Sequence, residues 1–287
     1  MKKTDTLKEI TAKKRERLAS AKLAVPEEQL KSAIAGLAPA RPFLEAISKP
    51  KSIALIAELK RNSPSAGRLR ADLDPPALAA QYQEAGVQAI SVLTEEDFFG
   101  GSLADLAAVK NSVVVPVLRK DFILEPYQIL ESRAAGADAV LLISDILTKD
   151  QLAEFITLSD ILGMDCLVEA HDEKELKKLL SLKVAPPEAA VAPGAPVPSA
   201  KAKKRKQIDF ALGINNRDLH TLEVDPRTTE KLYPLVPKDR TVVVESGIKT
   251  YQDVLFLKIL GANAVLVGES ILKEGDVKTA IQELMGW

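Results

Sequence analysis

The chain has 287 residues, of which 46% are hydrophobic and 28% are charged, as expected for a globular protein with a substantial core. Its 39 basic and 40 acidic residues nearly cancel, so the net charge favours neither nucleic acid nor an anionic membrane. With a single cysteine, Cys166, and no apolar run near the roughly 18 residues of a membrane span, we expect a cytoplasmic protein with a local functional site.

An amphipathic segment, residues 1–48, precedes a regular alternation of apolar runs and helical patterns. The runs predict strands at 52–60, 88–93, 116–120, 138–143, 164–169, 209–215, 240–246 and 263–268. Helical patterns separate them, for example at 75–85, 125–135, 149–162 and 172–182. We expect Pro116 at the first position of its strand, where a missing N–H is tolerated.

A repeated helix-to-strand junction gives the period of this alternation. Helical patterns end at Gly86, Gly136 and Gly261, and glycine suits the left-handed position after a helix. One unit of a strand and its helix takes about 25 residues. The 50 residues from Gly86 to Gly136 therefore equal two units, and the 125 residues from Gly136 to Gly261 equal five. One of these units is the segment 184–207, which is rich in Pro, Ala and Lys, and which we predict to be a disordered insertion.

Eight such units with nearly continuous apolar strands predict a closed parallel barrel. We therefore expect an α/β protein with a (β/α)8 TIM barrel over residues 49–287 and a helical extension, residues 1–48. A doubly wound open sheet is the alternative. The insertion joins the fifth helix to the sixth strand, which places it opposite the barrel mouth as a tolerated surface linker.

Charged side chains stand near the ends of several predicted strands. Side chains alternate along a strand, so Glu58 and Lys60 share one inward face, and Lys120 and Glu169 point inward from two other strands. Active sites of this fold lie at the carboxyl ends of the strands. Since such groups are rarely buried without partners, we predict a polar pocket with mutual pairing at the mouth.

Glycines after the last two strands indicate a phosphate site. Gly247 and Gly268 allow backbone N–H groups to approach a phosphate where this fold commonly binds one, although either glycine taken singly is equally explained as a turn residue. The neighbouring Glu269 would repel a phosphate through its carboxylate, so its contact is assigned to the backbone.

Several blocks, in the same order along the chain, resemble the signature blocks of indole-3-glycerol phosphate synthase. They occupy residues 56–65, 93–95, 99–102, 117–122, 167–171, 213–219, 245–247 and 267–268. The first 48 residues also resemble the family's N-terminal extension, which covers the barrel mouth.

The resemblance implies a lyase step of tryptophan biosynthesis. The substrate would be 1-(2-carboxyphenylamino)-1-deoxyribulose 5-phosphate, which cyclises to indole-3-glycerol phosphate with loss of carbon dioxide and water. No cofactor is implied, and the sequence has neither a dinucleotide-binding glycine fingerprint after its first strand nor a His and Cys pattern for a metal. The expected partner is this phosphorylated small molecule, without nucleic acid or membrane.

The resemblance also implies roles for individual residues. Lys120 matches the general acid, Glu169 the base, and Lys60 an acid or a partner for the substrate carboxylate, while Glu58 and Asn215 complete the catalytic group. The matching substrate-binding positions are Ser63, Phe99, Phe122, Leu141, Arg217, Glu245 and Ser246. The phosphate-binding positions are Gly247, Gly268 and Glu269, and no residue is assigned to a metal.

Two other classes stay open at this point. A different phosphosugar barrel, such as phosphoribosylanthranilate isomerase, would use another acid–base pair, and a non-catalytic binding protein would not need these lysines and carboxylates. His171 is expected to help cap the helix that begins near Asp172, and it is left out of the site together with His220. We expect a monomer, because no exposed apolar stripe stands out in the sequence.

Overall fold

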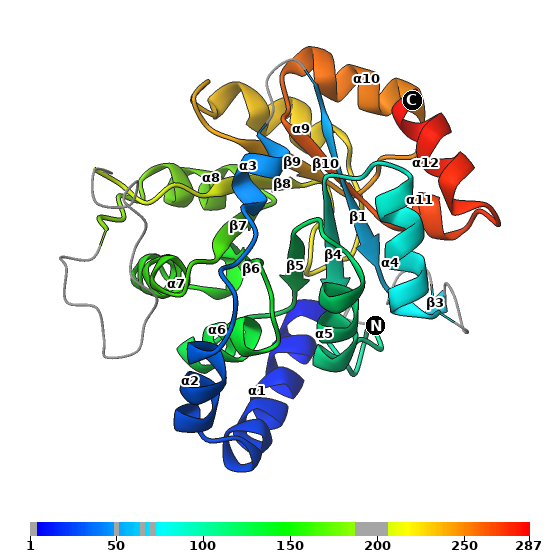
Figure 1. Cartoon of the computed structure of the whole chain (residues 1–287). Helices are drawn as coiled ribbons and strands as arrows, with labels where there is room; N and C mark the ends of the chain where they lie inside the picture. The colour runs from blue at the N-terminus through cyan, green and yellow to red at the C-terminus, as the bar shows by residue number, and fades with distance from the viewer. Residues whose placement is uncertain (1–4, 49–51, 64–66, 69–72, 187–205) are drawn as a thin grey trace.

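The computed structural model describes residues 5–48, 52–63, 67–68, 73–186 and 206–287 and contains a closed barrel of eight parallel strands (Figure 1). The barrel strands are β1 (Ala54–Leu59), β4 (Ala89–Leu93), β5 (Val117–Lys120), β6 (Ala139–Ile143), β7 (Asp165–Ala170), β8 (Ala211–Asn215), β9 (Val242–Glu245) and β10 (Ala264–Val267). Strand β1 pairs with both β4 and β10, which closes the sheet. The predicted barrel is confirmed, and the open-sheet alternative is wrong. A short antiparallel pair, β2 (Asn62–Ser63) and β3 (Gly67–Arg68), follows β1.

Helices follow the strands and surround the barrel (Figure 1). They are α4 (Pro75–Glu84), α5 (Leu103–Ser112), α6 (Pro126–Ala134), α7 (Lys149–Ile161), α8 (Glu173–Leu180), α9 (Arg227–Leu232), α10 (Tyr251–Leu260), α11 (Glu269–Leu272) and α12 (Val277–Met285), with 3-10 turns η1 (Ser144–Ile146) and η3 (Tyr233–Leu235). The predicted junction glycines Gly86, Gly136 and Gly261 have φ values of 91°, 91° and 108°. This left-handed conformation confirms why glycine ends these helices.

The N-terminal extension contacts the outside and both ends of the barrel. It comprises α1 (Thr6–Ala24), α2 (Glu27–Ala35) and α3 (Phe43–Ile47). At the carboxyl end, Leu7 and Ile10 of α1 are buried against the interior residues of the barrel mouth. Helix α2 then runs alongside α6 (Figure 1). The extension therefore reaches more of the barrel than the mouth, and its boundary at residue 48 stays a prediction.

Helix α3 closes the amino end of the barrel. Its Phe43 and Ile47 are fully buried against the small side chains of Ala54 and other inward-facing alanines. The backbone N–H of Leu44 donates to the carboxylate of Asp165, at the start of β7, over 2.8 Å. Alanines at these inward positions leave the space that the two larger side chains fill, so the barrel interior is a packed core at this end.

The insertion is attached at the same end of the barrel. Residues 187–205 lie outside the described part of the chain, so the predicted disorder of 184–207 is not described by the structure. The flanking segments meet where the N–H of Ile208 donates to the carbonyl of Val184 over 2.8 Å, shortly before β8 begins. The attachment points are therefore opposite the mouth, as the chain order predicts.

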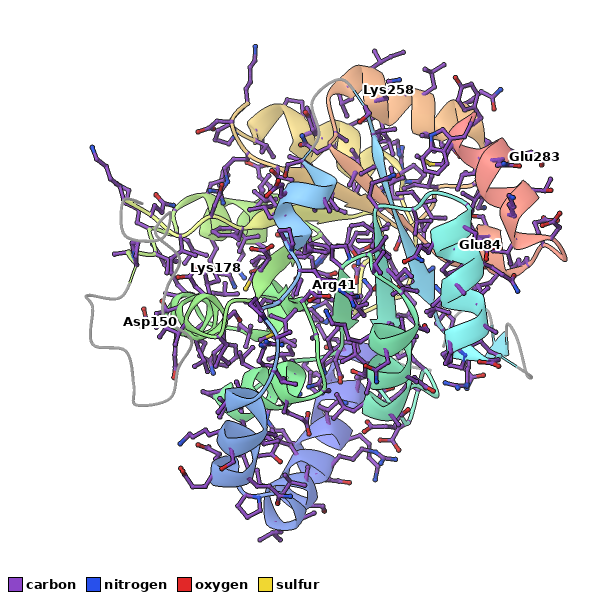
Figure 2. All side chains as sticks on the ribbon, viewed as in Figure 1. Arg41, Glu84, Asp150, Lys178, Lys258 and Glu283 are labelled. Atoms are coloured by element: carbon purple, nitrogen blue, oxygen red, sulfur yellow. The ribbon has the colours of Figure 1, made fainter. Side chains whose placement is uncertain are left out.

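The outer surfaces of the helices carry charged side chains, such as Lys258 and Glu283, which project away from the barrel (Figure 2).

Helix α10 also exposes apolar side chains, with Leu255, Phe256 and Ile259 exposed by 38%, 45% and 77%. The premise of the monomer expectation, that the chain has no exposed apolar stripe, is therefore wrong. Among the described helices, none has the length and apolar character needed to cross a membrane.

Candidate active site

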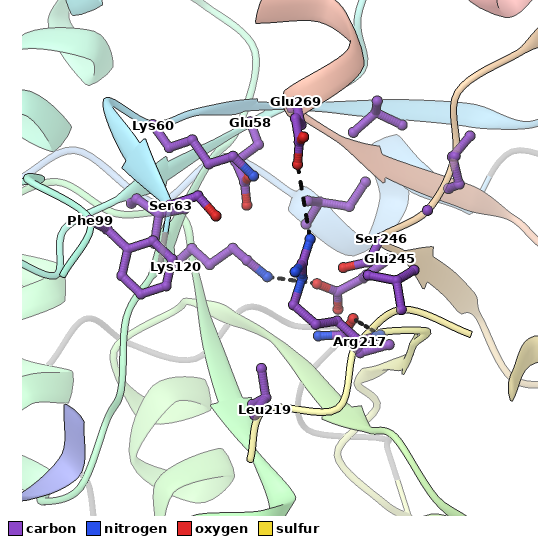
Figure 3. Close-up of a pocket in the computed structure, with 18 of the residues that line it drawn as sticks. Glu58, Lys60, Ser63, Phe99, Lys120, Arg217, Leu219, Glu245, Ser246 and Glu269 are labelled. Carbon is purple, nitrogen blue, oxygen red and sulfur yellow. Dashed lines mark hydrogen bonds and ion pairs between the residues drawn. The ribbon is translucent and has the colours of Figure 1, made fainter. Parts of the chain in front are cut away.

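A cavity of about 910 Å³ opens at the carboxyl ends of the strands. All fifteen residues that the sequence predicts for the site line this cavity. Figure 3 shows several of them, including Lys60, Lys120 and Arg217, pointing into a shared space. The barrel thus brings together side chains from strands that are far apart in the sequence, although their chemical roles remain predictions at this stage.

Lys120, at the end of β5, lies between two buried carboxylates. Its Nζ is 2.7 Å from Oε2 of Glu245 (Figure 3). The same Nζ is 3.7 Å from Oε2 of Glu169. Burial lowers the pKa of Lys120, but its carboxylate neighbours, Glu245 first, outweigh burial and raise the pKa above its ordinary value. Lys120 is therefore a charged ammonium group at neutral pH, able to stabilise an oxyanion or donate a proton.

For Glu169, on β7, burial affects the pKa more than the neighbouring Lys120 does. Burial is the main cause that raises its pKa to about 8, and the charge of Glu245 adds to it, while Lys120 and a hydrogen bond from Asn215 oppose the shift. The Nδ2 group of Asn215 donates to Oε1 of Glu169 over 3.3 Å. Within the described part of the chain, Oε2 of Glu169 has no hydrogen-bond partner. A carboxyl that changes its charge near neutral pH suits proton transfer.

A second ion pair lies at the end of β1. The Nζ of Lys60 is 2.6 Å from Oε2 of Glu58, and both side chains are largely buried. Burial raises the pKa of Glu58, but nearby cations, Lys60 first, outweigh it and bring the pKa below its ordinary value. A Cβ atom at Gly268 would lie 2.7 Å from Oε2 of Glu58, so glycine is needed where β10 ends beside this pair.

Aromatic and aliphatic side chains form one wall of the cavity. The rings of Phe99 and Phe122 have centroids 6.2 Å apart at an interplanar angle of 32°. Leu141 also lines the cavity, as predicted, and so do Ile10 and Leu219, which the sequence analysis missed. Ile10 is an apolar residue that is buried in the structure, but the sequence of α1 does not tell which surface covers it.

The glycine-rich corner of the cavity, formed by Ser246, Gly247 and Gly268, contains two residues with positive φ. Gly247 has φ of 77°, and a Cβ atom there would lie 2.9 Å from Val224. Ser246, although not glycine, has φ of 66°, a sparsely populated conformation that is often found at functional sites. Gly268 precedes the short helix α11, which places further backbone N–H groups at this corner.

The side chain of Glu269 is held at the edge of this corner. Its carboxylate is 2.7 Å from Nζ of Lys273. It is also 3.9 Å from Nη2 of Arg217 (Figure 3). The hydrogen bond with Lys273 is the main cause that lowers the pKa of Glu269, so this carboxylate is charged. The side chain of Glu269 is therefore paired with cations, and the predicted backbone contact with a phosphate at this position stays a prediction.

The two histidines take part in a separate network near the mouth. The Nδ1 atom of His171 is 2.9 Å from Asp145, which is the main cause that raises the pKa of His171 to about 9. The Nδ1 atom of His220 is 2.8 Å from Asp5, the residue that caps α1. The expected capping role of His171 is wrong, because the carboxylate of Asp172 itself accepts the hydrogen bond at the start of α8.

The described residues contain no group of three or more His, Cys, Asp or Glu side chains that could hold a metal ion. The polar groups of the cavity are ammonium, guanidinium, carboxylate and amide groups together with backbone N–H groups. These groups can bind anions and transfer protons.

The barrel and its charged carboxyl-end cavity define the chain as a (β/α)8-barrel enzyme. Solved structures with this fold include 3-hexulose-6-phosphate synthase from Salmonella typhimurium, with a TM-score of 0.58 and 15% identity over 82% of this chain and 97% of that one. N-acetylmannosamine-6-phosphate 2-epimerase from Clostridium perfringens has a TM-score of 0.52 and 13% identity over 80% of this chain and 90% of that one. At these identities the similarity shows the fold alone.

Sequence comparison identifies the family. The family model of indole-3-glycerol phosphate synthase matches residues 7–185 and 207–284. A protein of this name from Rhodopirellula baltica is 41% identical over 97% of this chain and 98% of its own length. Another from Acetivibrio thermocellus is 43% identical over 84% of this chain and 83% of its own length. The chain belongs to the indole-3-glycerol phosphate synthase family, and it is a carboxy-lyase of tryptophan biosynthesis that acts on a phosphorylated small molecule.

Proposed function

We propose that the cavity binds 1-(2-carboxyphenylamino)-1-deoxyribulose 5-phosphate in a single orientation. The phosphate lies at the backbone of Gly247, Gly268 and Glu269, and Arg217 faces it from the end of β8. The aryl ring packs against Phe99 and Phe122 at the opposite side of the cavity. The observation that carries this proposal is the buried Lys120 ammonium, 2.7 Å from one carboxylate and 3.7 Å from another, in the same cavity as the glycine-rich corner.

Ring closure requires a cationic group beside the ketone oxygen of the substrate. When the aryl carbon that carries the carboxylate attacks the ketone carbon, negative charge develops on the carbonyl oxygen. Lys120, charged because Glu245 raises its pKa, stabilises this oxygen and donates the proton that turns it into a hydroxyl group. Carbon dioxide then leaves from the attacking carbon, and the electron pair of the broken bond restores the aromatic ring.

Dehydration requires an acid for the departing hydroxyl group and a base for a proton on the new five-membered ring. Glu169 is the base, since its Oε2 lacks a hydrogen-bond partner in the described part of the chain and its pKa of about 8 suits proton transfer. Asn215 holds the other oxygen of this carboxylate through its amide group. The hydroxyl group leaves as water after it receives a proton from a lysine, the role assigned to Lys60.

Lys60 also binds the carboxylate of the substrate before carbon dioxide leaves. Its partner Glu58 keeps the ammonium group within the cavity, where it meets the aryl end of the substrate. Ser63, Leu141 and Ser246 line the cavity and complete the surface around the substrate.

The purified chain tests this proposal directly. Incubation with 1-(2-carboxyphenylamino)-1-deoxyribulose 5-phosphate should produce indole fluorescence, together with one carbon dioxide for each product molecule. The Lys120→Met variant keeps the apolar stem of the side chain and removes its charge, so it should form product at least about a hundredfold more slowly. A wild-type chain that forms no indole product under these conditions would contradict the proposal.

We further propose that the enzyme acts in the cytoplasm. A biosynthetic family and a single, buried cysteine support the location. Sedimentation equilibrium of the full chain tests the monomer that the sequence predicts. If the chain is a dimer, the exposed apolar residues Leu255, Phe256 and Ile259 of α10 are the first candidates for its interface.

A further inference from the structure

Helix α1 carries a buried lysine that lies outside the set of residues lining the cavity. The side chain of Lys14 is 5% exposed, and its Nζ lies 2.8 Å from Oδ1 of Asp121 and 3.1 Å from Oε2 of Glu96. The preceding Lys13 is 48% exposed and pairs with Glu16 on the same helix. Lys14 thus connects α1 with two separate loops at the barrel mouth, whereas Lys13 contacts its own helix.

The first of these loops follows Lys120. The Oδ1 atom of Asp121 accepts a hydrogen bond from the backbone N–H of Phe122 over 2.8 Å. The same oxygen forms the ion pair with Lys14. Its Oδ2 atom accepts from Thr94 over 2.6 Å and from Arg119 over 2.9 Å. The buried Asp121 carboxylate therefore determines the backbone position of Phe122, and Lys14 supplies one of its two cationic partners.

The second loop presents Phe99. The carboxylate of Glu95 is fully buried and accepts from the backbone N–H groups of Asp97, Phe98 and Phe99 over 3.0, 2.8 and 3.0 Å. This arrangement closes the turn after β4 and sets the direction in which Phe99 leaves it. Glu96, the partner of Lys14, lies in the same turn.

The two loops that meet at Lys14 carry the two aromatic rings of the cavity wall. Both carboxylates that Lys14 contacts lie within three residues of Phe99 or Phe122 in the sequence, and the rings themselves contact one another. An aromatic wall of this kind binds a flat aryl ring only when its rings keep their spacing and tilt. The other end of the cavity, at Gly247 and Gly268, has no described contact with Lys14.

We propose that Lys14 is a positioning residue that fixes Phe99 relative to Phe122 and thereby determines affinity for the aryl end of the substrate. This inference rests on the proposed orientation of the substrate, with its aryl ring at Phe99 and Phe122. Lys14 acts through the two loops and contacts no reacting atom.

The test compares Lys14→Met with the matched control Lys13→Met, which removes an exposed ammonium group from the same helix. Dissociation constants for anthranilate, the aryl half of the substrate, and for inorganic phosphate are measured by NMR titration, so that binding is read without turnover. We expect Lys14→Met to weaken anthranilate binding about tenfold or more, which corresponds to about 1.4 kcal/mol, while phosphate affinity changes less than twofold. Lys13→Met should leave both constants unchanged.

Steady-state kinetics of the same variants supply a second readout. The KM of the substrate should rise in Lys14→Met more than kcat falls, and Lys14→Arg should recover part of the loss because it keeps the charge. If Lys14→Met fails to fold, Glu96→Gln tests the same connection, since it releases the loop of Phe99 and leaves Lys14 paired with Asp121. Glu96→Gln should weaken anthranilate binding in the same direction but by less.

The outcomes separate this inference from the proposed function. Equal loss of anthranilate and phosphate binding, or binding constants unchanged from wild type, would overturn the role of Lys14 even in an active enzyme. A wild-type chain that forms no indole product would overturn the proposed function, whatever the two variants bind.

Discussion

The raised pKa of Glu169 predicts how activity depends on pH. If this carboxylate is the base, the free enzyme is competent only when Glu169 is ionised, and kcat/KM reports ionisations of the free enzyme. Burial and the charge of Glu245 raise the pKa from an ordinary value of 4.5 to about 8. The ionised fraction is then about 0.09 at pH 7 and about 0.91 at pH 9, so kcat/KM should rise about tenfold over this interval. An unshifted carboxyl would give no rise.

Indole fluorescence under saturating and subsaturating substrate, at constant ionic strength from pH 6 to pH 9.5, measures this profile. The Glu169→Gln variant is the matched control, because it keeps the shape of the side chain and cannot titrate. Its turnover should fall at least about a hundredfold, and its remaining kcat/KM should lose the rise between pH 7 and pH 9. The same rise in both enzymes, or a flat profile in the wild type, would refute the assignment of Glu169.

The same ionisation predicts a change in stability that does not depend on catalysis. Between pH 4.5 and pH 8 the folded chain keeps the proton on Glu169, whereas the unfolded chain has released it. Unfolding therefore releases a proton, and the contribution of Glu169 to the free energy of unfolding falls with pH, by up to about 1.4 kcal/mol per pH unit. In urea titrations, Glu169→Gln should become more stable relative to wild type as pH rises, and a constant difference would contradict the pKa shift.

Four further changes have defined outcomes. Lys120→Ala should lower turnover at least about a hundredfold with unchanged circular dichroism, and near wild-type turnover would reject its role as the acid. Gly268→Ala should raise KM in steady-state kinetics, because the new Cβ would lie 2.7 Å from the carboxylate of Glu58; an unchanged KM would mean that this corner relaxes freely. Deletion of residues 186–204 should leave turnover nearly unchanged, and a large loss would show that the insertion affects the chemistry. Asp138→Ala should lower the free energy of unfolding by about 1–3 kcal/mol, as measured in urea, with kcat unchanged, since this fully buried carboxylate accepts hydrogen bonds from two backbone N–H groups.

The sequence by itself determined the architecture and fifteen of the residues that line the cavity, but it did not reveal Ile10 and Leu219. Strand and helix patterns of fixed period, with glycine required after helices at Gly86, Gly136 and Gly261, leave few arrangements other than an eightfold barrel. Alternation along each strand then decides which charged residues face inward. This local rule predicts the inward face for Glu58, Lys120 and Glu169, whereas most of the other predicted residues that line the cavity came from the resemblance to the family.

Only the tertiary structure decided which of these groups pair and what covers them. Lys120 is closer to Glu245 than to Glu169, which raises the pKa of the lysine, whereas burial is the main cause that raises the pKa of Glu169. Likewise, the sequence of α1 does not show that Ile10 reaches the cavity or that Lys14 is buried and contacts two loops. Periodicity acts within one segment, whereas distances between strand ends and the path of α1 across the mouth depend on the register of the closed barrel, to which all eight strands contribute.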